Sequence, residues 1–461
     1  MPETAGRRSN VVSMEITGLN HDGDGVGRLD GLAVFVPGAL PGDKVRARLT
    51  VTKKSYARAE VVEITKMSPG RIRPPCTVAG PCGGCSLQSM AYEEQLVWKT
   101  RAVEDAIARI GGLKEVTVRP CLPARHPMHY RNKVQFPVAM QRGVPVAGCY
   151  ARGTHEVVPT EDCLIQHETN NLIVRESLRL ISELGLTVYD ERRGGGLMRH
   201  IMGRVAPGTG EAMAVIVTSI KRFTRGGEFA SALTKAVPGL VGVLQNINNE
   251  KTNIILGRET RVITGRGHID DLFGNDRTGR LRFRISPLSF YQVNAEQAAE
   301  LYAQALEYAG LTPATTAVDV YSGIGTITLF LAKSCRQVFG IEEVAPAVAD
   351  AKQNARLNGI ENVRFITGRA ERVLPRFLQG PGVKTDVVVL DPPRKGCEES
   401  VLGTIVKMRP GRIVYVSCYP ATLARDLAIL QRSGYRAVVT QPVDMFPQTN
   451  HVESCTLVVR E

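Results

Sequence analysis

The sequence predicts an α/β protein in which a small β-barrel and a central α+β region precede a C-terminal domain built on a parallel sheet. Two short apolar runs, 387–390 and 413–416, are bounded by turn-forming residues, as is typical of buried parallel strands. A third apolar run, 317–320, leads through a Gly-rich turn into a helical pattern. Near the N-terminus, residues 11–65 form short β-rich runs separated by Gly-rich turns, which indicates a barrel.

Length and composition are those of a soluble protein with several domains. The chain has 461 residues, too many for one ordinary core, and we expect two to four domains. Its 43% hydrophobic and 22% charged residues are typical of globular proteins. No uncharged apolar run reaches the roughly 18 residues of a membrane span, and residues 1–8 lack the apolar core of a signal peptide. We therefore expect a cytoplasmic protein with no membrane partner.

The excess of basic residues favours a polyanionic partner. Lys and Arg number 58 against 45 Asp and Glu, a formal net charge of +13. Between positions 43 and 73 nine basic residues stand against three acidic ones. A solvated face would explain this density, but its place on a strand-rich segment favours nucleic acid. The expectation of RNA, and not DNA, follows only from the family resemblance given below.

The N-terminal segment carries a recognisable order of turns. After a polar tail over residues 1–8, which we expect to be disordered, the runs Gly23-Asp24-Gly25-Val26-Gly27-Arg28 and Val36-Pro37-Gly38-Ala39-Leu40-Pro41-Gly42-Asp43 flank a β-rich stretch. With the basic third strand that follows, they resemble the TRAM module, an OB-like RNA-binding barrel. We expect this domain over residues 8–66.

Four cysteines have the spacing of a metal site. Cys76, Cys82 and Cys85 follow the pattern C-x5-C-x2-C, and Cys163 is a fourth cysteine far downstream. Thiolates are soft ligands that suit zinc or an iron–sulfur cluster. No second C-x2-C and no matching histidines are present, so a 4Fe-4S cluster fits better than a zinc ribbon, although zinc remains the alternative. Disulfides are not expected in a long cytoplasmic chain.

The cysteines lie at the start of the expected central domain, 67–285. Apolar residues at helical spacing predict a helix over 91–110, ending at Gly111-Gly112, that docks on the C-terminal domain. Alternating strands and a helix near 170–184 follow. The basic and aromatic run 129–136 is either part of an RNA channel, stacking on bases, or an ordinary strand.

The C-terminal domain, expected over 286–461, carries the signs of a nucleoside site. Its strand at 317–320 ends in Tyr321-Ser322-Gly323-Ile324-Gly325-Thr326, and Glu342 ends the next strand, where a carboxylate binds ribose hydroxyls. The G-x-G lacks the third glycine of a dinucleotide fingerprint, which disfavours NAD. Joined to Glu342 and to Asp391-Pro392-Pro393, it indicates S-adenosylmethionine.

A cysteine stands where another buried strand ends. Cys418 follows the apolar run 413–416, and Asp391 follows the run 387–390, so both can face the crevice beyond the carboxyl ends of the strands. Two interpretations of Cys418 fit its position equally: a nucleophilic thiol in a polar setting, or a small buried core residue.

Together these segments resemble the RNA uracil-5-methyltransferases, in particular the iron–sulfur subgroup that modifies 23S ribosomal RNA in bacteria. The resemblance spans nearly the whole chain, and five segments match in order: 290–294, 319–325, 391–396, 417–420 and 451–453. It implies a Rossmann-like, S-adenosylmethionine-dependent methyltransferase domain that makes 5-methyluridine, and a central domain holding a 4Fe-4S cluster. We expect a monomer.

The resemblance also assigns roles. It implies that Cys418 is the nucleophile and Glu453 the general base. The implied cofactor contacts are Gln292, Tyr321, Glu342 and Asp391, and the implied cluster ligands are Cys76, Cys82, Cys85 and Cys163. Thr326 and Arg369 depart from some relatives beside the cofactor. Cys121, Cys149, Cys335, Cys397 and Cys455 have no motif context and are interpreted as packing residues or bystanders.

The reaction explains these residue types. Carbon 5 of uracil is a poor nucleophile, so a thiolate must first add to carbon 6. After methylation a carboxylate removes the proton from carbon 5. The target must lie in a loop or be flipped out of its stack.

Two rival hypotheses remain at this stage. The first is the same chemistry on transfer RNA, and the second is a non-catalytic RNA-binding or chaperone protein. The cofactor motifs, Cys418 and Glu453 argue against the second. Radical chemistry at the cluster is disfavoured, because all four cysteines are committed as ligands and no C-x3-C-x2-C triad is present.

Overall fold

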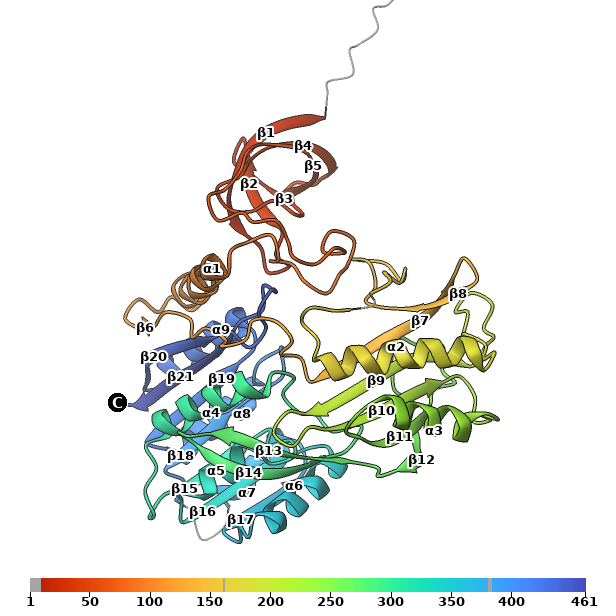
Figure 1. Cartoon of the computed structure of the whole chain (residues 1–461). Helices are drawn as coiled ribbons and strands as arrows, with labels where there is room; N and C mark the ends of the chain where they lie inside the picture. Colours follow the sequence, from red (N-terminus) through yellow and green to blue (C-terminus); the bar gives the residue numbers. More distant parts are fainter. Residues whose placement is uncertain (1–9, 161, 380–383) are drawn as a thin grey trace, which may run out of the picture.

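A computed structural model describes residues 10–160, 162–379 and 384–461. A barrel stands above a larger body, in which a central sheet lies beside the C-terminal sheet (Figure 1). The polar tail expected over residues 1–8 lies outside the described residues. Within the described ranges, none of the helices has the length and apolar character needed to cross a membrane.

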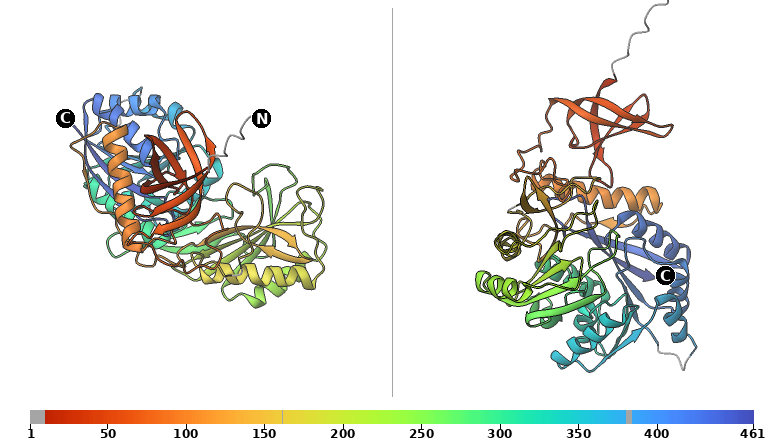
Figure 2. Two further views of the ribbon diagram at one scale, coloured as in Figure 1. Left: turned by 90° about the horizontal axis from the view of Figure 1, so that it is seen from above. Right: turned by 90° about the vertical axis from the view of Figure 1, so that its right-hand side faces the viewer.

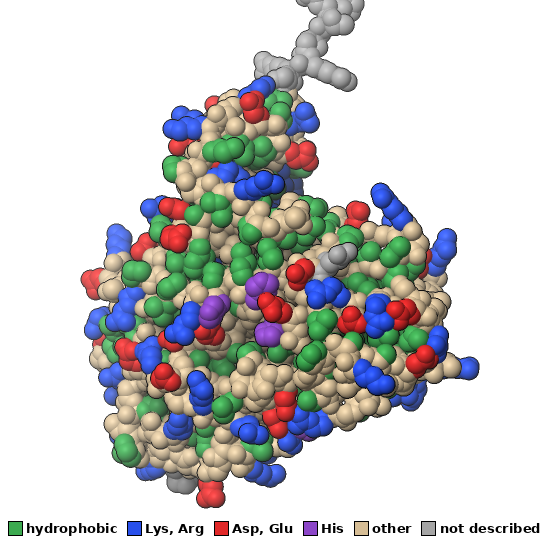
Figure 3. Space-filling view, viewed as in Figure 1, with side chains coloured by type: hydrophobic (Ala, Val, Ile, Leu, Met, Phe, Trp, Pro, Cys, Tyr) green, Lys and Arg blue, Asp and Glu red, His purple; other side chains and the backbone are tan. Residues whose placement is uncertain are grey.

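The N-terminal strands close into a barrel, as predicted. Their order around it is β1-β2-β3-β5-β4. Buried and exposed side chains alternate along the strands, so one face of each strand fills the barrel interior. Along β4, Val45 and Ala47 are buried while Lys44, Arg46 and Arg48 are exposed. Lys and Arg side chains surround the barrel on the face shown in Figure 3, including a group at its foot. The strands are β1 (Val11–Leu19), β2 (Gly25–Leu29), β3 (Leu32–Val36), β4 (Lys44–Thr52) and β5 (Tyr56–Lys66).

The predicted helix after the cysteines forms α1 (Tyr92–Asp105), which continues as a π-helical turn, η1 (Ala106–Ile110). It lies below the barrel and against the C-terminal sheet (Figure 1). Two polar contacts hold it there. The fully buried Lys99 forms an ion pair with Asp444, and the Tyr92 hydroxyl donates a hydrogen bond of 2.9 Å to the same carboxylate. A charge buried in this way must keep its partner, so we expect the α1 contact to be rigid.

The central region forms a six-stranded sheet in the order β12-β11-β10-β9-β7-β8. Two helices pack on it through residues such as Ile173 and Phe229. Of the run 129–136, residues 133–136 belong to strand β7, and Tyr130 and Phe136 are buried, so these two rings do not stack on bases. The elements are β7 (Lys133–Gln141), β8 (Val144–Ala147), α2 (Glu168–Glu183), β9 (Met198–Ala206), β10 (Glu211–Thr218), α3 (Gly226–Ala236), β11 (Leu240–Ile247) and β12 (Glu259–Gly265).

A hairpin of β13 (Ile269–Asn275) and β14 (Gly279–Ile285) joins this region to the C-terminal domain. Phe273 and Phe283 pack edge to face at 5.9 Å, and Phe273 also meets Tyr302 of α4 at 5.6 Å. This aromatic cluster ties the hairpin to the C-terminal core.

The C-terminal sheet has eight strands in the order β17-β16-β15-β18-β19-β21-β20-β6. β15 to β19 are parallel, and β21 is antiparallel to both β19 and β20. Apolar clusters cover both faces, which agrees with the predicted Rossmann-like fold. The strands are β15 (Thr316–Val320), β16 (Gln337–Glu342), β17 (Val363–Thr367), β18 (Val387–Leu390), β19 (Arg412–Ser417), β20 (Tyr435–Val443) and β21 (Glu453–Arg460).

The edge strand β6 (Thr117–Val118) pairs with β20 although it comes from within the expected central range 67–285. Figure 2 shows this sheet and its helices from two further sides. After β15 the chain adds β16 and β17 on one side of it and then β18 and β19 on the other. This reversal of strand order leaves a crevice where β15 and β18 end. The helices of this domain are α4 (Ala295–Ala309), α5 (Thr326–Ala332), α6 (Ala345–Leu357), α7 (Ala370–Phe377), α8 (Glu399–Met408) and α9 (Pro420–Arg432).

Candidate active site and cysteine cavity

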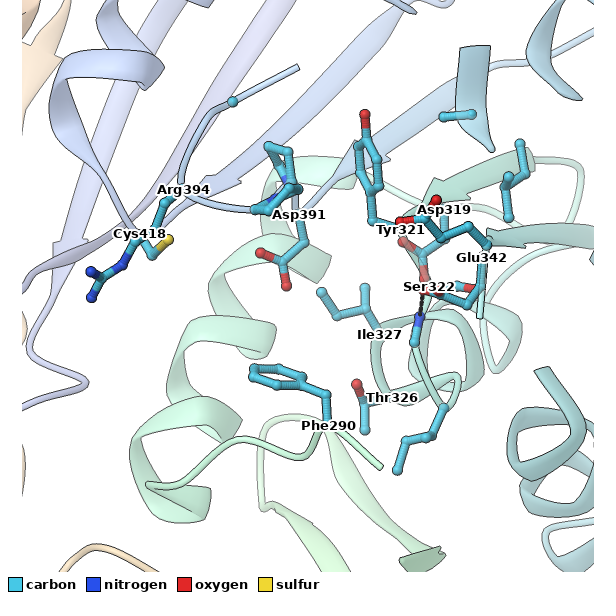
Figure 4. Close-up of a pocket in the computed structure, with 18 of the residues that line it drawn as sticks. Phe290, Asp319, Tyr321, Ser322, Thr326, Ile327, Glu342, Asp391, Arg394 and Cys418 are labelled. Carbon is cyan, nitrogen blue, oxygen red and sulfur yellow. Dashed lines mark hydrogen bonds between the residues drawn. The ribbon is translucent and has the colours of Figure 1, made fainter. Parts of the chain in front are cut away.

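A cavity of about 540 Å³ lies at the carboxyl ends of β15, β16, β18 and β19. Cys418 lies at one end of it and Glu342 at the other, and the Asp391 carboxylate points into the space between them (Figure 4). All six residues predicted for catalysis and cofactor binding line this cavity: Gln292, Tyr321, Glu342, Asp391, Cys418 and Glu453. The cavity therefore joins the two halves of the predicted site.

The Gly-rich turn forms the end of the cavity next to Glu342. Gly323 has φ +55° and a Cβ there would meet no atom within 4 Å, so the backbone faces open space. Its N–H donates to Glu342 Oε2 at 3.0 Å, and the Val344 N–H donates to Glu342 Oε1 at 2.8 Å. The Glu342 carboxylate is thus fixed beside exposed backbone, an arrangement suited to the ribose of a nucleoside.

Three carboxyl groups in or below the cavity have raised pKa values. Burial raises the pKa of Asp319 to about 7 and, with Asp319 nearby, that of Asp391 to about 7. Burial and Asp391 raise the pKa of Glu453 to about 8, against the opposing effect of Arg394. Asp319 Oδ1 has no hydrogen-bond partner among the described residues. Acids crowded in this way favour a cationic ligand, because its charge would stabilise their ionised forms.

Cys418 and Glu453 meet at the ends of neighbouring strands. β19 and β21 are antiparallel with Ser417 opposite Ser454; Cys418 follows Ser417 and Glu453 precedes Ser454, and the Glu453 charge helps to raise the pKa of Cys418. Cys418 is half-buried and faces the cavity, whereas Cys121, Cys335, Cys397 and Cys455 are buried. This geometry favours a reactive thiol over a core residue.

The resting thiol needs activation. Burial, followed by the charges of Glu453 and Asp391, raises the pKa of Cys418 to about 12, and Arg394 lowers it. Arg394 stands beside Cys418 in Figure 4, and its guanidinium lies 3.4 Å from His451 Nε2. Arg394 had no predicted role. The sequence feature that could have predicted a role for Arg394 is its position directly after Asp391-Pro392-Pro393.

The loop before α4 forms another wall. Gln292 is buried, and its carbonyl accepts a hydrogen bond of 2.9 Å from the Asn132 side chain. Phe290 is 71% exposed and lines the cavity. Thr326 and Arg369, the two residues that differ from some relatives, both have partners in the cavity wall. The Thr326 hydroxyl shares a 3.2 Å hydrogen bond with the Tyr302 hydroxyl, and Arg369 lies near Glu371.

The four predicted metal-binding cysteines line a second cavity, of about 340 Å³. Cys149, which we interpreted as a packing residue or bystander, lines it too, because β8 delivers the residue after Gly148 to the cysteine loop. The side chain of Cys149 contacts Cys82, and this hydrogen bond lowers the pKa of Cys82. Sequence spacing held no signal for this contact, since 66 residues separate the two.

The cysteine cavity has a cationic wall. Arg131 and Lys133 line it, and no ion pair of Lys133 with a carboxylate occurs in the described part of the chain. Burial, with Arg204 and Arg131 nearby, lowers the pKa of Lys133 to about 7. In the same described residues, no three His, Cys, Asp or Glu side chains gather as a single metal ion requires. Cysteines that bind separate irons of a cluster stand farther apart than the ligands of one ion.

Comparison with known proteins identifies the family. The family model for tRNA (uracil-5-)-methyltransferases matches residues 242–461, and the TRAM model matches residues 9–62. An uncharacterized RNA methyltransferase of Halalkalibacterium halodurans is 45% identical over 98% of this chain and 97% of its own length. One from Caldanaerobacter subterraneus is 47% identical over 97% of each chain. The chain belongs to the RNA uracil-5-methyltransferase family.

A solved structure from this family has the same fold. The tRNA (uracil-54, C5)-methyltransferase of Pyrococcus abyssi, in complex with S-adenosyl-L-homocysteine, is 26% identical, with a TM-score of 0.75 over 97% of this chain and 100% of that one. The chain is therefore an RNA methyltransferase with a TRAM barrel, and S-adenosylmethionine is its methyl donor. A sulfonium cation fits the acid-rich cavity described above.

The methyl donor should activate Cys418 by its charge. At about pH 8 we expect iodoacetamide to modify Cys418 roughly tenfold faster with S-adenosylmethionine than with S-adenosylhomocysteine, because only the former carries a positive charge that favours the thiolate. Peptide mass spectrometry would quantify this cysteine separately from the other nine. Since the two ligands have nearly the same shape, equal rates would show that charge does not activate the thiol.

Proposed function

We propose that this enzyme methylates carbon 5 of a uridine in 23S ribosomal RNA, with Cys418 as nucleophile and Glu453 as general base. The observation that carries the proposal is that Cys418 and Glu453, which flank the paired Ser417 and Ser454 of β19 and β21, line the same cavity. Thiolate and base must act on the same ring, at adjacent carbons, so they must lie close to each other.

Each step of the proposed reaction is assigned to a residue of this chain. The Cys418 thiolate adds to carbon 6 of uracil, and the electron pair of the 5,6 double bond moves to carbon 5 and the carbonyl oxygen. S-adenosylmethionine supplies the methyl group to carbon 5. Glu453 then takes the proton from carbon 5, and the bond between Cys418 and carbon 6 breaks to restore the ring. Arg394 lies beside Cys418, where its charge favours the thiolate.

Within the cofactor cavity we assign four contacts to the methyl donor. Glu342, held by two backbone N–H groups, would accept the ribose hydroxyls. Tyr321 lies on the Gly-rich turn next to it, with φ +73°. Asp391 lies between Glu342 and Cys418, where the sulfonium and amino-acid part must reach for methyl transfer (Figure 4), and Gln292 lines the same cavity.

The RNA substrate is tested by labelling. We would incubate the protein, purified without oxygen, with labelled S-adenosylmethionine and separate unmodified 23S ribosomal RNA and transfer RNA transcripts, and map the label by nuclease digestion. Label as 5-methyluridine in ribosomal RNA alone would support the proposal. Label in transfer RNA alone would favour the rival substrate, the one in the name of the Pyrococcus abyssi enzyme.

We also propose that the second cavity holds a 4Fe-4S cluster on Cys76, Cys82, Cys85 and Cys163. Three observations support it: the thiols share one cavity, its wall carries Arg131 and Lys133, and thiolates are the usual ligands of such clusters. A cluster with four thiolates is an anion, which the charge of Arg131 would stabilise and which would favour the protonated form of Lys133. Val293, next to Gln292, lines the same cavity, so the cluster would support the active-site loop.

Removing one ligand should therefore cost both iron and stability. We expect Cys82→Ala to lose most bound iron and acid-labile sulfide and to lower Tm by roughly 5 °C or more, since metal binding contributes to the free energy of folding. The matched control is Cys335→Ala, because Cys335 lies outside both cavities. Stoichiometric zinc in place of iron would favour the zinc alternative, and a metal-free protein of normal stability would contradict any metal site.

A further inference from the structure

A third cavity, separate from the cysteine cavity, lies next to the active site and below the barrel. It is a cavity of about 370 Å³, and it shares Arg394, Cys418 and His451 with the cofactor cavity. Glu453 and Asp391 line only the cofactor cavity. Cys418 therefore stands at a boundary, with the methyl donor and base on one side and a separate space on the other.

The walls of this flanking cavity come from three parts of the chain. The barrel contributes Leu19 to Asp22, the helix α1 with η1 contributes Trp98 and Ala102, and the start of α9 contributes Tyr419 to Ala421. Two aromatic rings and several apolar side chains thus face a common space. Aromatic rings of this kind stack on bases without sequence preference.

Cations stand at the rim of the flanking cavity. Arg394 is exposed where the two cavities meet, and Arg109 of η1 is exposed on the other side, where it pairs with Asp105 at 3.2 Å. Asp22 and Asp105 also line the cavity, so Arg394 is its one cation without an ion pair among the described residues. The apolar rings suit the flat faces of a base, and Arg394 suits the anionic phosphate of a nucleotide.

Polar contacts hold the barrel loop in place over this cavity. The Asn450 side chain donates a hydrogen bond to the His21 carbonyl, and it accepts one of 2.8 Å from Ser86. The Arg152 guanidinium reaches the Asp22 carbonyl at 2.9 Å and forms an ion pair with Asp24. The cavity is therefore a built feature of the junction between the barrel and the C-terminal domain.

We propose that the flanking cavity binds the base of the nucleotide next to the target uridine, stacked on Trp98. The inference rests on the proposed function, since it takes the target uracil to be bound at Cys418. Consecutive nucleotides are joined by one phosphate, and Arg394 lies where that phosphate would pass between the cavities. The RNA must then be single-stranded over at least two nucleotides, with both bases turned out of any helical stack.

Trp98 is the chain's single tryptophan, so the tryptophan emission of the protein comes from a residue that lines this cavity. The probe is the transcript that accepts methyl groups in the labelling experiment, titrated into the protein with S-adenosylhomocysteine bound. Stacking should lower the emission by roughly half, in a saturable way that follows RNA binding measured by filter retention. RNA binding with unchanged emission would overturn the inference.

A variant that fills the cavity gives the matched test. Ala102→Phe on α1 narrows the flanking cavity far from the cofactor, and Ala108→Phe, on the exposed side of η1, is the control. For Ala102→Phe we expect the emission change to vanish and kcat/KM for RNA to fall roughly tenfold to a hundredfold, the cost of losing one stacked base. Binding of S-adenosylhomocysteine, measured by calorimetry, should stay equal in all three proteins.

The outcomes separate the inference from the proposed function. Methyl transfer by the wild type, with equal emission changes in Ala102→Phe and wild type, overturns the flanking site and leaves the reaction. No methyl transfer by the wild type to any RNA overturns both. Methyl transfer with the expected loss in Ala102→Phe alone supports both.

Discussion

We expect Cys418→Ala to lower the rate of methyl transfer to RNA by at least about a thousandfold, because Cys418 is the one thiol among the described residues that line the cavity. RNA binding and S-adenosylmethionine binding should remain within about twofold, since the variant removes one sulfur from a half-buried position. The measurement is initial-rate methyl transfer with labelled cofactor, alongside calorimetry for the cofactor.

A second readout links the loss to covalent chemistry. RNA that contains 5-fluorouridine should form a denaturation-resistant complex with the wild type, because a base cannot remove fluorine from carbon 5 as it removes a proton. Cys418→Ala should form none. The matched control is Cys335→Ala, which removes a sulfur far from the cavity and should keep both activity and complex. Full methylation by Cys418→Ala would show that Cys418 is not the nucleophile.

We expect Glu453→Gln to stall the reaction after methyl transfer. The amide is close in shape to the carboxyl group but cannot accept the proton from carbon 5, so turnover should fall roughly 10²- to 10⁴-fold. The bond from Cys418 to carbon 6 cannot then break, and ordinary RNA should accumulate as a covalent complex that carries one new methyl group. Denaturing gel electrophoresis with labelled cofactor measures this species.

The raised pKa of Glu453 predicts in which direction turnover changes with pH. Burial raises its pKa to about 8 in the free protein, so at neutral pH the carboxyl group is mostly protonated and cannot act as a base. Turnover should therefore rise with pH toward 8 in the wild type. The bound sulfonium should shift this rise to lower pH. Glu399→Gln, at an exposed position on α8, is the matched control. A variant Glu453→Gln with normal turnover and no covalent complex would assign the base elsewhere.

Local patterns in the sequence were enough to predict four of the residues that line the cavity at the carboxyl ends of the strands, whereas Gln292 and Glu453 were implied only by the family resemblance. Strand ends are marked by apolar runs followed by turn formers, so Tyr321, Glu342, Asp391 and Cys418 could be placed at one sheet edge before the structure was known. The choice between a reactive and a core Cys418 could not be made, because it depends on exposure, which β21 sets from the far end of the chain.

Features built from distant segments escaped prediction for the same reason. Cys149 meets Cys82 only because β8 crosses to the cysteine loop, and the flanking cavity needs the barrel, α1 and α9 together. The π-helical turn at Ala106–Ile110 also has no signal, since helical periodicity over five residues does not separate an α-helix from a π-helix. Hydrophobic pattern predicts elements, whereas contacts between them follow from the whole fold.

The position of β6 has a consequence for how the protein is made. Thr117 and Val118 leave the ribosome early, yet their partner β20 is synthesised more than 300 residues later, and β20 itself is held to the sheet by β21, the last strand of the chain. The barrel can close as soon as it emerges, but α1 and β6 must wait until β20 and β21 have been made. A nascent chain thus leaves the side of α1 that meets β20 uncovered until then, and the strand that completes the sheet also carries Glu453, the residue proposed as the base.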